Sequence, residues 1–148
     1  IEAVRQLCER GWLFDGTLEG AKLSAANLEG ADLEHANLKG VNLCGAHLEG
    51  ANLESANLNG ARLIETHLEN ANLECANLEN AHLEEANLSG ANLRLANLFM
   101  ANMMYTNLKG AILYGADLEF AKYTIGTNRT KWPDENFDPI EKGMIEVE

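Results

Sequence analysis

Small and aliphatic residues recur along this chain with a period of five. The segment Ala-Asn-Leu-Glu-Gly at residues 26–30 is followed by Ala-Asp-Leu-Glu-His at 31–35, and the pattern runs without a gap from residue 11 to residue 125. Leucine occupies the third position in 21 of these 23 pentads, with Met103 and Tyr123 as the exceptions. An α-helix rotates residues five apart by about 140°, and a flat strand points them to opposite faces. Neither element places these leucines on one face.

Within one pentad, however, the small residue and the leucine lie two positions apart, which is the period of a strand. If the last two residues turn the chain by a quarter circle, every leucine faces one common axis. Four pentads then make a coil of 20 residues, and successive coils stack as parallel strands about 4.8 Å apart. The preference for right-handed crossovers predicts the winding. We therefore expect an all-β solenoid over 11–125, a right-handed quadrilateral parallel β-helix of nearly six coils.

The remaining pentad positions agree with this geometry. Nine pentads end in glycine, and Asn70 and Asn80 end two more. Glycine and asparagine tolerate the positive φ that tight type II turns require. Asparagine also fills the second position 12 times, and columns of asparagine one coil apart are expected to hydrogen-bond along the axis.

This repeat resembles that of the pentapeptide-repeat proteins, whose fold is a right-handed quadrilateral β-helix. The resemblance covers about three quarters of the chain and implies the fold strongly but an activity only weakly. A shorter resemblance lies after the repeats, where Thr-Lys-Trp-Pro at 130–133 and Phe-Asp-Pro at 137–139 are similar to a tail of pentapeptide proteins from photosynthetic bacteria.

The two ends of such a rod need covers, because an open β-edge templates aggregation. Ile1, Val4, Leu7 and Cys8 follow helical spacing, so residues 1–10 are expected to form a short capping α-helix. The alternative is a partner-binding helix or a linker, since the chain begins at Ile1 instead of methionine and suggests a domain cut from a longer protein. Residues 126–148 are expected to form an irregular tail that folds back on the last coils.

Outward positions of the last coils carry large apolar side chains where earlier coils carry Glu, Gly or Ser. They are Leu95, Phe99, Met100, Met104, Tyr105, Tyr114 and Phe120. A cluster of this size indicates an interaction. The first expectation is that the tail covers it, and the alternative is an interface in a homodimer or with a partner.

Charge points to a second surface. The chain has 23 acidic and 11 basic residues and a net charge of −12, which argues against direct binding of nucleic acid through phosphates. Glutamates fall into two outward columns on adjacent sides: Glu34, Glu54 and Glu74 in one, and Glu29, Glu49 and Glu69 in the other. Like charges one ladder step apart repel each other, so the acidic surface is either only solubilising or useful in binding.

The family resemblance adds an alternative, because some pentapeptide-repeat proteins mimic duplex DNA and bind type II topoisomerases such as DNA gyrase. Pentads 11–125 hold 15 acids and 6 bases, a net charge of −9. Spread over about 28 Å, this is roughly half the charge density of B-DNA. No loop interrupts the repeat, whereas the mimics often carry one.

No sequence pattern indicates an enzyme or a cofactor. The glycines recur as corners instead of forming a phosphate loop, and the serines are isolated on outward faces. His47 and His67 lie one coil apart and are expected to stack, but a zinc site needs three or four ligands, and neither Cys nor a further His falls beside them. No metal ligand is therefore predicted.

Three cysteines at unrelated spacings favour reduced thiols and a cytoplasmic location. No apolar run reaches the ~18 residues of a membrane span. The sequence thus predicts a rigid acidic scaffold that binds an unidentified protein, as a monomer or as a homodimer through its last coils. The alternatives are the DNA mimic and a structural spacer in a longer protein.

Overall fold

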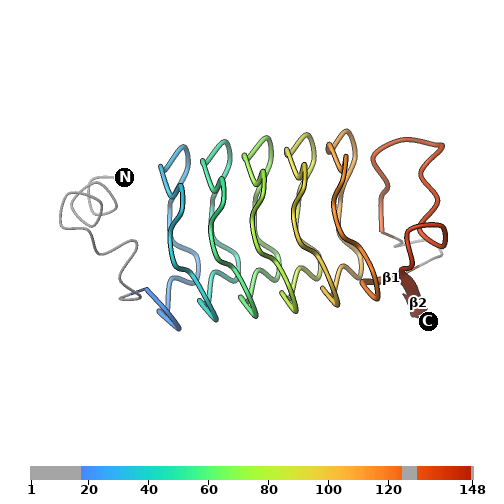
Figure 1. Cartoon of the computed structure of the whole chain (residues 1–148). Coiled ribbons are helices and arrows are strands. Elements are labelled where there is room, and N and C mark those ends of the chain that lie inside the picture. Colours follow the sequence, from blue (N-terminus) through green and yellow to red (C-terminus); the bar gives the residue numbers. More distant parts are fainter. Residues whose placement is uncertain (1–17, 125–129, 148) are drawn as a thin grey trace.

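The computed structural model describes residues 18–124 and 130–147. Residues 18–124 wind a four-sided parallel β-helix whose coils lie side by side along one axis (Figure 1). Parallel bridges join residues twenty apart, as from Asn52 to Asn72 and from Asn72 to Asn92. The predicted fold class is confirmed for these residues. The capping helix predicted over 1–10 lies outside the described residues. Within residues 18–124 and 130–147, no helix is long and apolar enough to span a membrane.

Backbone hydrogen bonds hold each coil to the next at every side. On one side the Leu53 amide donates to the Asn72 carbonyl at 2.7 Å, and the Asn72 amide donates to the Ala51 carbonyl at 2.9 Å. At the corner the Ser55 amide donates to the Glu74 carbonyl at 2.8 Å. Since these bonds exist only between neighbouring coils, the repeats depend on one another for stability.

The interior of the helix is a column of leucines and small residues. The third-position leucines from Leu43 to Leu98 are at most 1 % exposed, as the pattern predicts. Thr66 and Thr106 replace alanine at the first position and are fully buried. Their hydroxyls donate to the Leu43 and Leu83 carbonyls at 3.0 and 2.9 Å, so the core accepts them without an unpaired polar group.

Every corner from Gly20 to Phe120 takes a left-handed backbone conformation, whether or not the residue favours it. The expected glycines have positive φ, but so do twelve non-glycine residues, among them Leu95 at 56°, Met100 at 58° and Tyr105 at 62°. Glycine and asparagine are thus not the only residues at these turns. The hydrogen bonds of the neighbouring coils impose the conformation on side chains that would otherwise avoid it.

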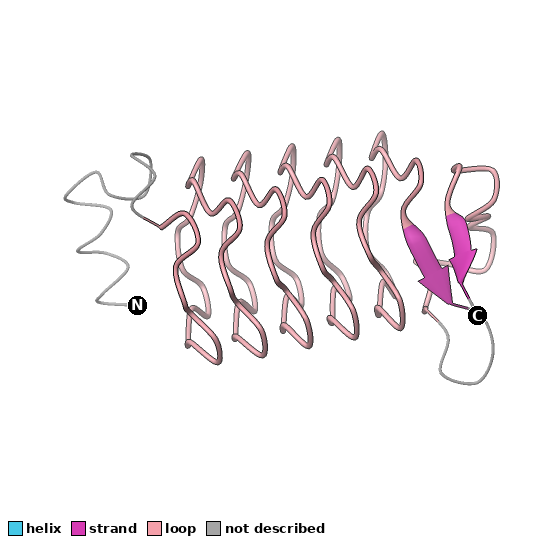
Figure 2. Ribbon diagram, turned by 90° about the horizontal axis from the view of Figure 1, so that it is seen from below, coloured by secondary structure: helices cyan, strands magenta, loops and turns pink. Residues whose placement is uncertain are grey.

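Within residues 18–124 and 130–147, the two regular strands lie near the C-terminal end of the rod (Figure 2). Strand β1 (Lys122–Thr124) belongs to the last coil, and β2 (Ile145–Val147) pairs with it in parallel, Lys122 opposite Ile145. The pairing continues the register of the coils, because the Ile145 amide donates to the Ala121 carbonyl as Lys122 does to Ala101. The end of the chain therefore covers the open edge of the β-helix.

The ladder also extends beyond residue 125, where the sequence pattern predicted its end. Lys131 bridges to Asn107, the Gly110 amide donates to the Pro133 carbonyl at 3.0 Å, and Thr130 is buried like the threonines of the core. The offset from Asn107 to Lys131 is 24 residues instead of 20, and Trp132 stands where leucine is expected. This insertion and substitution concealed the additional side from a search for a fixed period.

Candidate interaction surface

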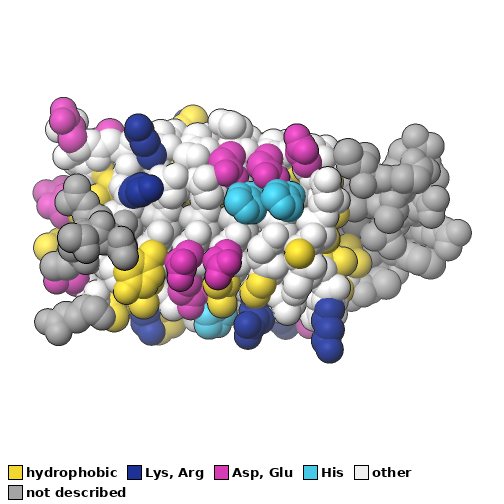
Figure 3. Space-filling view, turned by 180° about the vertical axis from the view of Figure 1, so that it is seen from behind, with side chains coloured by type: hydrophobic (Ala, Val, Ile, Leu, Met, Phe, Trp, Pro, Cys, Tyr) yellow, Lys and Arg dark blue, Asp and Glu magenta, His cyan; other side chains and the backbone are white. Residues whose placement is uncertain are grey.

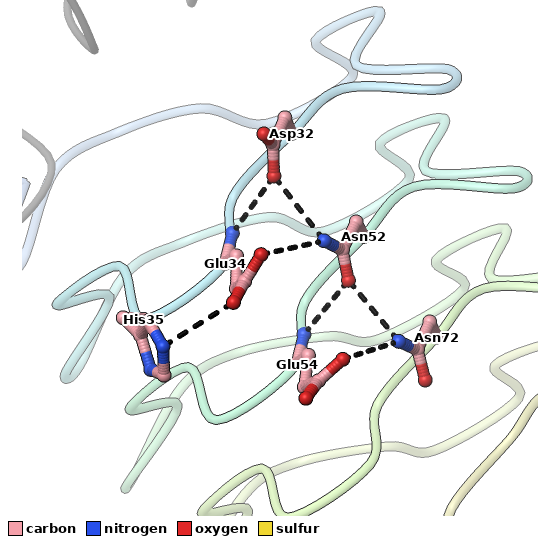
Figure 4. A network of polar contacts seen from close by, with 6 residues as sticks. All are labelled: Asp32, Glu34, His35, Asn52, Glu54 and Asn72. Atoms are coloured by element: carbon pink, nitrogen blue, oxygen red, sulfur yellow. Dashed lines mark hydrogen bonds and ion pairs between the residues drawn. The ribbon is translucent and has the colours of Figure 1, made fainter.

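The first predicted column, Glu34, Glu54 and Glu74, lies on one side of the rod beside a column of asparagines. Asn72 Nδ2 donates to Asn52 Oδ1 and to Glu54 Oε2, both at 3.2 Å. The same pair of bonds recurs one coil earlier, where Asn52 Nδ2 contacts Asp32 Oδ1 and Glu34 Oε2 at 3.3 Å (Figure 4). Each glutamate thus accepts an amide hydrogen from the following coil, which offsets repulsion along the column.

The side-chain oxygens of the asparagines also accept hydrogen bonds from backbone amides at the turns. Asn52 Oδ1 accepts from the Glu54 amide at 3.3 Å, and Asn72 Oδ1 accepts from the Glu74 amide at the same distance. The asparagine column predicted from the sequence is therefore present, but it binds the glutamates as well as itself. These carboxylates are partly structural, which the sequence did not reveal.

The second column, Glu29, Glu49 and Glu69, lies on the adjacent side next to His47 and His67. The two imidazole rings stack with centroids 4.7 Å apart and planes within 1°, as expected. His47 Nδ1 lies 2.9 Å from Glu49 Oε1, and His67 Nδ1 lies 3.6 Å from Glu69 Oε1. Figure 3 shows His side chains next to acidic ones on this face. The hydrogen bond with His47 lowers the pKa of Glu49, although burial acts in the opposite direction.

Arg94 marks the end of the first glutamate column. Its Nε lies 3.8 Å from Glu74 Oε1, and its guanidinium lies 5.1 Å from the centre of the Tyr114 ring one coil further. Along this column the surface is acidic up to Glu74 and apolar from Tyr114, and Arg94 lies between them.

The predicted apolar side chains surround the last coils on three sides of the rod. Together with Ile112, they form a set that we call the apolar belt: Leu95, Phe99, Met100, Met104, Tyr105, Ile112, Tyr114 and Phe120. Leu95, Ile112 and Tyr114 lie on one side. Phe99, Met100 and Phe120 lie on the next, and Met104 and Tyr105 on the third. Ile112 was missed by the sequence analysis, and its apolar character at a position normally occupied by asparagine could have revealed it.

The belt remains largely uncovered. Tyr114 is 71 % exposed, Leu95 53 %, Met100 50 % and Tyr105 42 %. The first expectation, that the tail covers this cluster, was wrong, because the described part of the tail continues the ladder and covers the end of the rod instead of its sides.

A hollow of about 530 Å³ opens in the tail, and none of the residues that line it belongs to the belt. It is lined by Lys109, Thr130, Lys131, Trp132, Pro133, Asp134, Glu135 and Phe137. Trp132 stacks on Phe137 at 5.1 Å between centroids and meets Tyr123 edge-on at 5.3 Å. Burial and the nearby Glu146 raise the pKa of the Tyr123 hydroxyl.

The fold defines the chain as a repeat protein, a four-sided parallel β-helix built from five-residue units. Comparison with known proteins identifies its family. A family model described as pentapeptide repeats matches residues 21–60 and 61–98, in eight copies. The chain belongs to the pentapeptide-repeat family. No curated protein sequence matches it significantly.

Several solved structures are similar to it. HetL, a pentapeptide-repeat protein involved in regulating heterocyst differentiation in the cyanobacterium Nostoc sp. strain PCC 7120, is 33 % identical over 70 % of this chain, with a TM-score of 0.43. This chain covers only 58 % of HetL. Rfr23 from the cyanobacterium Cyanothece 51142 is 25 % identical over 95 % of both chains, with a TM-score of 0.42.

Trypsin-treated QnrB1, a plasmid-mediated fluoroquinolone resistance protein, is 17 % identical over 88 % of this chain and 84 % of its own, with a TM-score of 0.54. At this identity the likeness shows a shared fold.

Proposed function

We propose that this chain is a non-catalytic, rigid acidic scaffold that binds another protein through the apolar belt. The acidic columns add electrostatic contacts with basic groups of that partner. The rigidity comes from the backbone bonds that join every coil to the next.

The observation that carries this proposal is the conformation of the belt. Leu95, Met100, Tyr105 and Phe120 are large, at least 42 % exposed, and held at φ between 56° and 62°. Each non-glycine residue in the left-handed backbone conformation costs about 1–2 kcal/mol. The exposed part of an apolar side chain contributes no burial energy to offset this cost. Glycine, which holds equivalent corners at Gly30, Gly40 and Gly60, would be less strained. Strained and exposed apolar side chains are best explained by a partner that buries them.

A site-specific photocross-linking experiment tests the proposal. A benzophenone amino acid replaces Tyr114 in the belt or, as the control, the exposed Ser24 near the other end of the rod. Illumination of native lysate should yield one defined product at position 114 and none at 24. A Leu95→Gly, Met100→Gly double variant should lose that product while its unfolding temperature stays the same or rises. Equal products at both positions would refute a role for the belt.

The two acidic columns favour DNA mimicry as a second candidate, since they present carboxylates on adjacent sides of one rod. If it holds, micromolar protein alters supercoiling by DNA gyrase, with or without a quinolone. A Glu34→Gln, Glu54→Gln, Glu74→Gln variant loses the effect because the glutamines keep the amide contacts but not the charge. No effect of the unmodified protein rejects this function.

A further inference from the structure

The stacked histidines have a third neighbour that the sequence analysis overlooked. One ring nitrogen of each of His47 and His67 and one carboxylate oxygen of Glu49 all lie within 4.8 Å of one another. The search for a metal site along the sequence considered only Cys and His as further ligands, but carboxylates bind zinc as well. Glu49 reaches the histidines because the second and fourth positions of a pentad point outward on the same side.

The site is held by the most regular part of the molecule. His47 and His67 form a parallel bridge, and the backbone on both sides of them is hydrogen-bonded to the neighbouring coils. The spacing of the two rings is therefore set by the rise of the β-helix. Both imidazoles are about half exposed, with side-chain exposures of 50 % and 44 %, so an ion reaches them directly from solvent.

One carboxylate oxygen of Glu49 has no hydrogen-bond partner among the described residues. Its Oε1 faces His47, whereas its Oε2 is buried and has no hydrogen-bond partner among the described residues. Glu69 Oε2, one coil further, and Glu84 Oε2, beside His82, are in the same state, so the second histidine is what distinguishes the site of Glu49. Buried carboxylate oxygens without partners are uncommon, and a cation is one group that satisfies them.

We propose that His47, His67 and Glu49 bind a divalent ion of the zinc type, with water completing a tetrahedral site. Zinc takes imidazole nitrogens at about 2.0–2.1 Å, so two ligand atoms of one ion lie roughly 3.4 Å apart. The three ligand atoms already lie within 4.8 Å of one another, so only small side-chain movements are needed to reach this spacing. Exposed rings achieve this by rotating about χ2, while the backbone stays in place.

The chain provides its own matched control. His82 is also exposed and lies 3.3 Å from Glu84 Oε1, but its neighbours in the column are Arg62 and Asn102 instead of a second histidine. Asparagine occupies this pentad position in neighbouring coils, at Asn27 and Asn87, so His→Asn variants suit the fold.

Isothermal titration of the tag-free chain with zinc chloride at pH 7.5 tests the site. One ion per chain is expected. His47→Asn and His67→Asn should each weaken binding at least about tenfold, by analogy with the loss of supporting residues at zinc sites. Glu49→Gln, which retains the hydrogen bond but not the charged ligand, should also weaken it, whereas His82→Asn should leave it unchanged.

A variant with Cys8, Cys44 and Cys75 replaced by serine removes competing thiols and should bind with the same stoichiometry. Thermal unfolding without zinc verifies that the histidine variants are folded. The proposal is overturned if the unmodified chain binds no zinc, if His47→Asn binds as well as the original, if His82→Asn weakens binding equally, or if the cysteine-free variant loses the ion.

Discussion

The acidic and apolar parts of the rod share one interior and differ only outside. Around residues 26–80 the outward positions carry glutamate, asparagine and histidine, while around 91–120 they carry Leu, Met, Phe and Tyr. Yet Leu48 and Leu98 are both fully buried, and both donate to the next coil at 2.7–2.8 Å. In this fold the first and third positions of each pentad form the core, and the outward positions vary from one part of the rod to the other.

The corners of the two parts differ in the kind of side chain they carry. In the acidic part the corners are glycines, such as Gly30 and Gly60, or small and polar residues, such as Ser55 and Glu65. In the belt, Leu95, Met100, Tyr105 and Phe120 place large apolar side chains at the same positive φ. The β-helix therefore requires the positive φ at its corners but tolerates different side chains there.

Truncation of the core should have the largest effect and should not distinguish the two parts. Leu48→Ala and Leu98→Ala each leave a cavity in a fully buried column, and each should lower the free energy of unfolding by about 2–5 kcal/mol. Urea denaturation followed by circular dichroism measures both. Losses that differ by more than a factor of two would show that the interiors are not equivalent.

Replacing a second-position asparagine should lower the free energy of unfolding more in the acidic part of the rod than in the apolar part. Asn72 Nδ2 donates twice and its Oδ1 accepts from Asn92 Nδ2 at 3.0 Å and from the Glu74 amide at 3.3 Å. Asn97, in the same pentad as Phe99 and Met100 of the belt, makes two such contacts, at 3.4 and 3.0 Å. Asn72→Ala should therefore cost about 2 kcal/mol and Asn97→Ala about 1. The same denaturation experiment compares them, and an equal cost would contradict the structural role of the acidic network.

Exchange of corner residues should have opposite signs at a glycine of the acidic part and at a methionine of the belt. Gly60→Ala places a side chain at φ 64° and should destabilise by about 1 kcal/mol, although nothing lies within 4 Å of the new Cβ. Met100→Gly relieves the same strain and should stabilise by about 0.5–1 kcal/mol. Differential scanning calorimetry reads both shifts. A loss of stability in Met100→Gly would mean that the methionine serves the fold itself.

Arg94 at the boundary should matter least for stability. Its contacts with Glu74 and Tyr114 are partly exposed, so Arg94→Ala should lower stability by less than about 1 kcal/mol. The decrease should shrink further in 0.5 M salt, because salt screens the ion pair. A cost that is larger and independent of salt would assign Arg94 a packing role.

Sequence reasoning was reliable where the repeat is strict and failed where one coil meets an irregular element. The column of asparagines and the stacking of His47 on His67 follow from a spacing of twenty alone. The contact of Glu54 with Asn72 does not, since it depends on how far a side chain reaches between coils. The side formed by residues 130–133 was missed because an insertion shifts it out of register.

The sequence by itself determined the coil, because a five-residue period of small and aliphatic side chains has one way to bury them all. Only the tertiary structure decided what lies on the outside and at the end. Those features arise from contacts between residues on different coils, such as Glu49 with the two histidines or β2 with β1, and a one-dimensional pattern does not contain the distances between them.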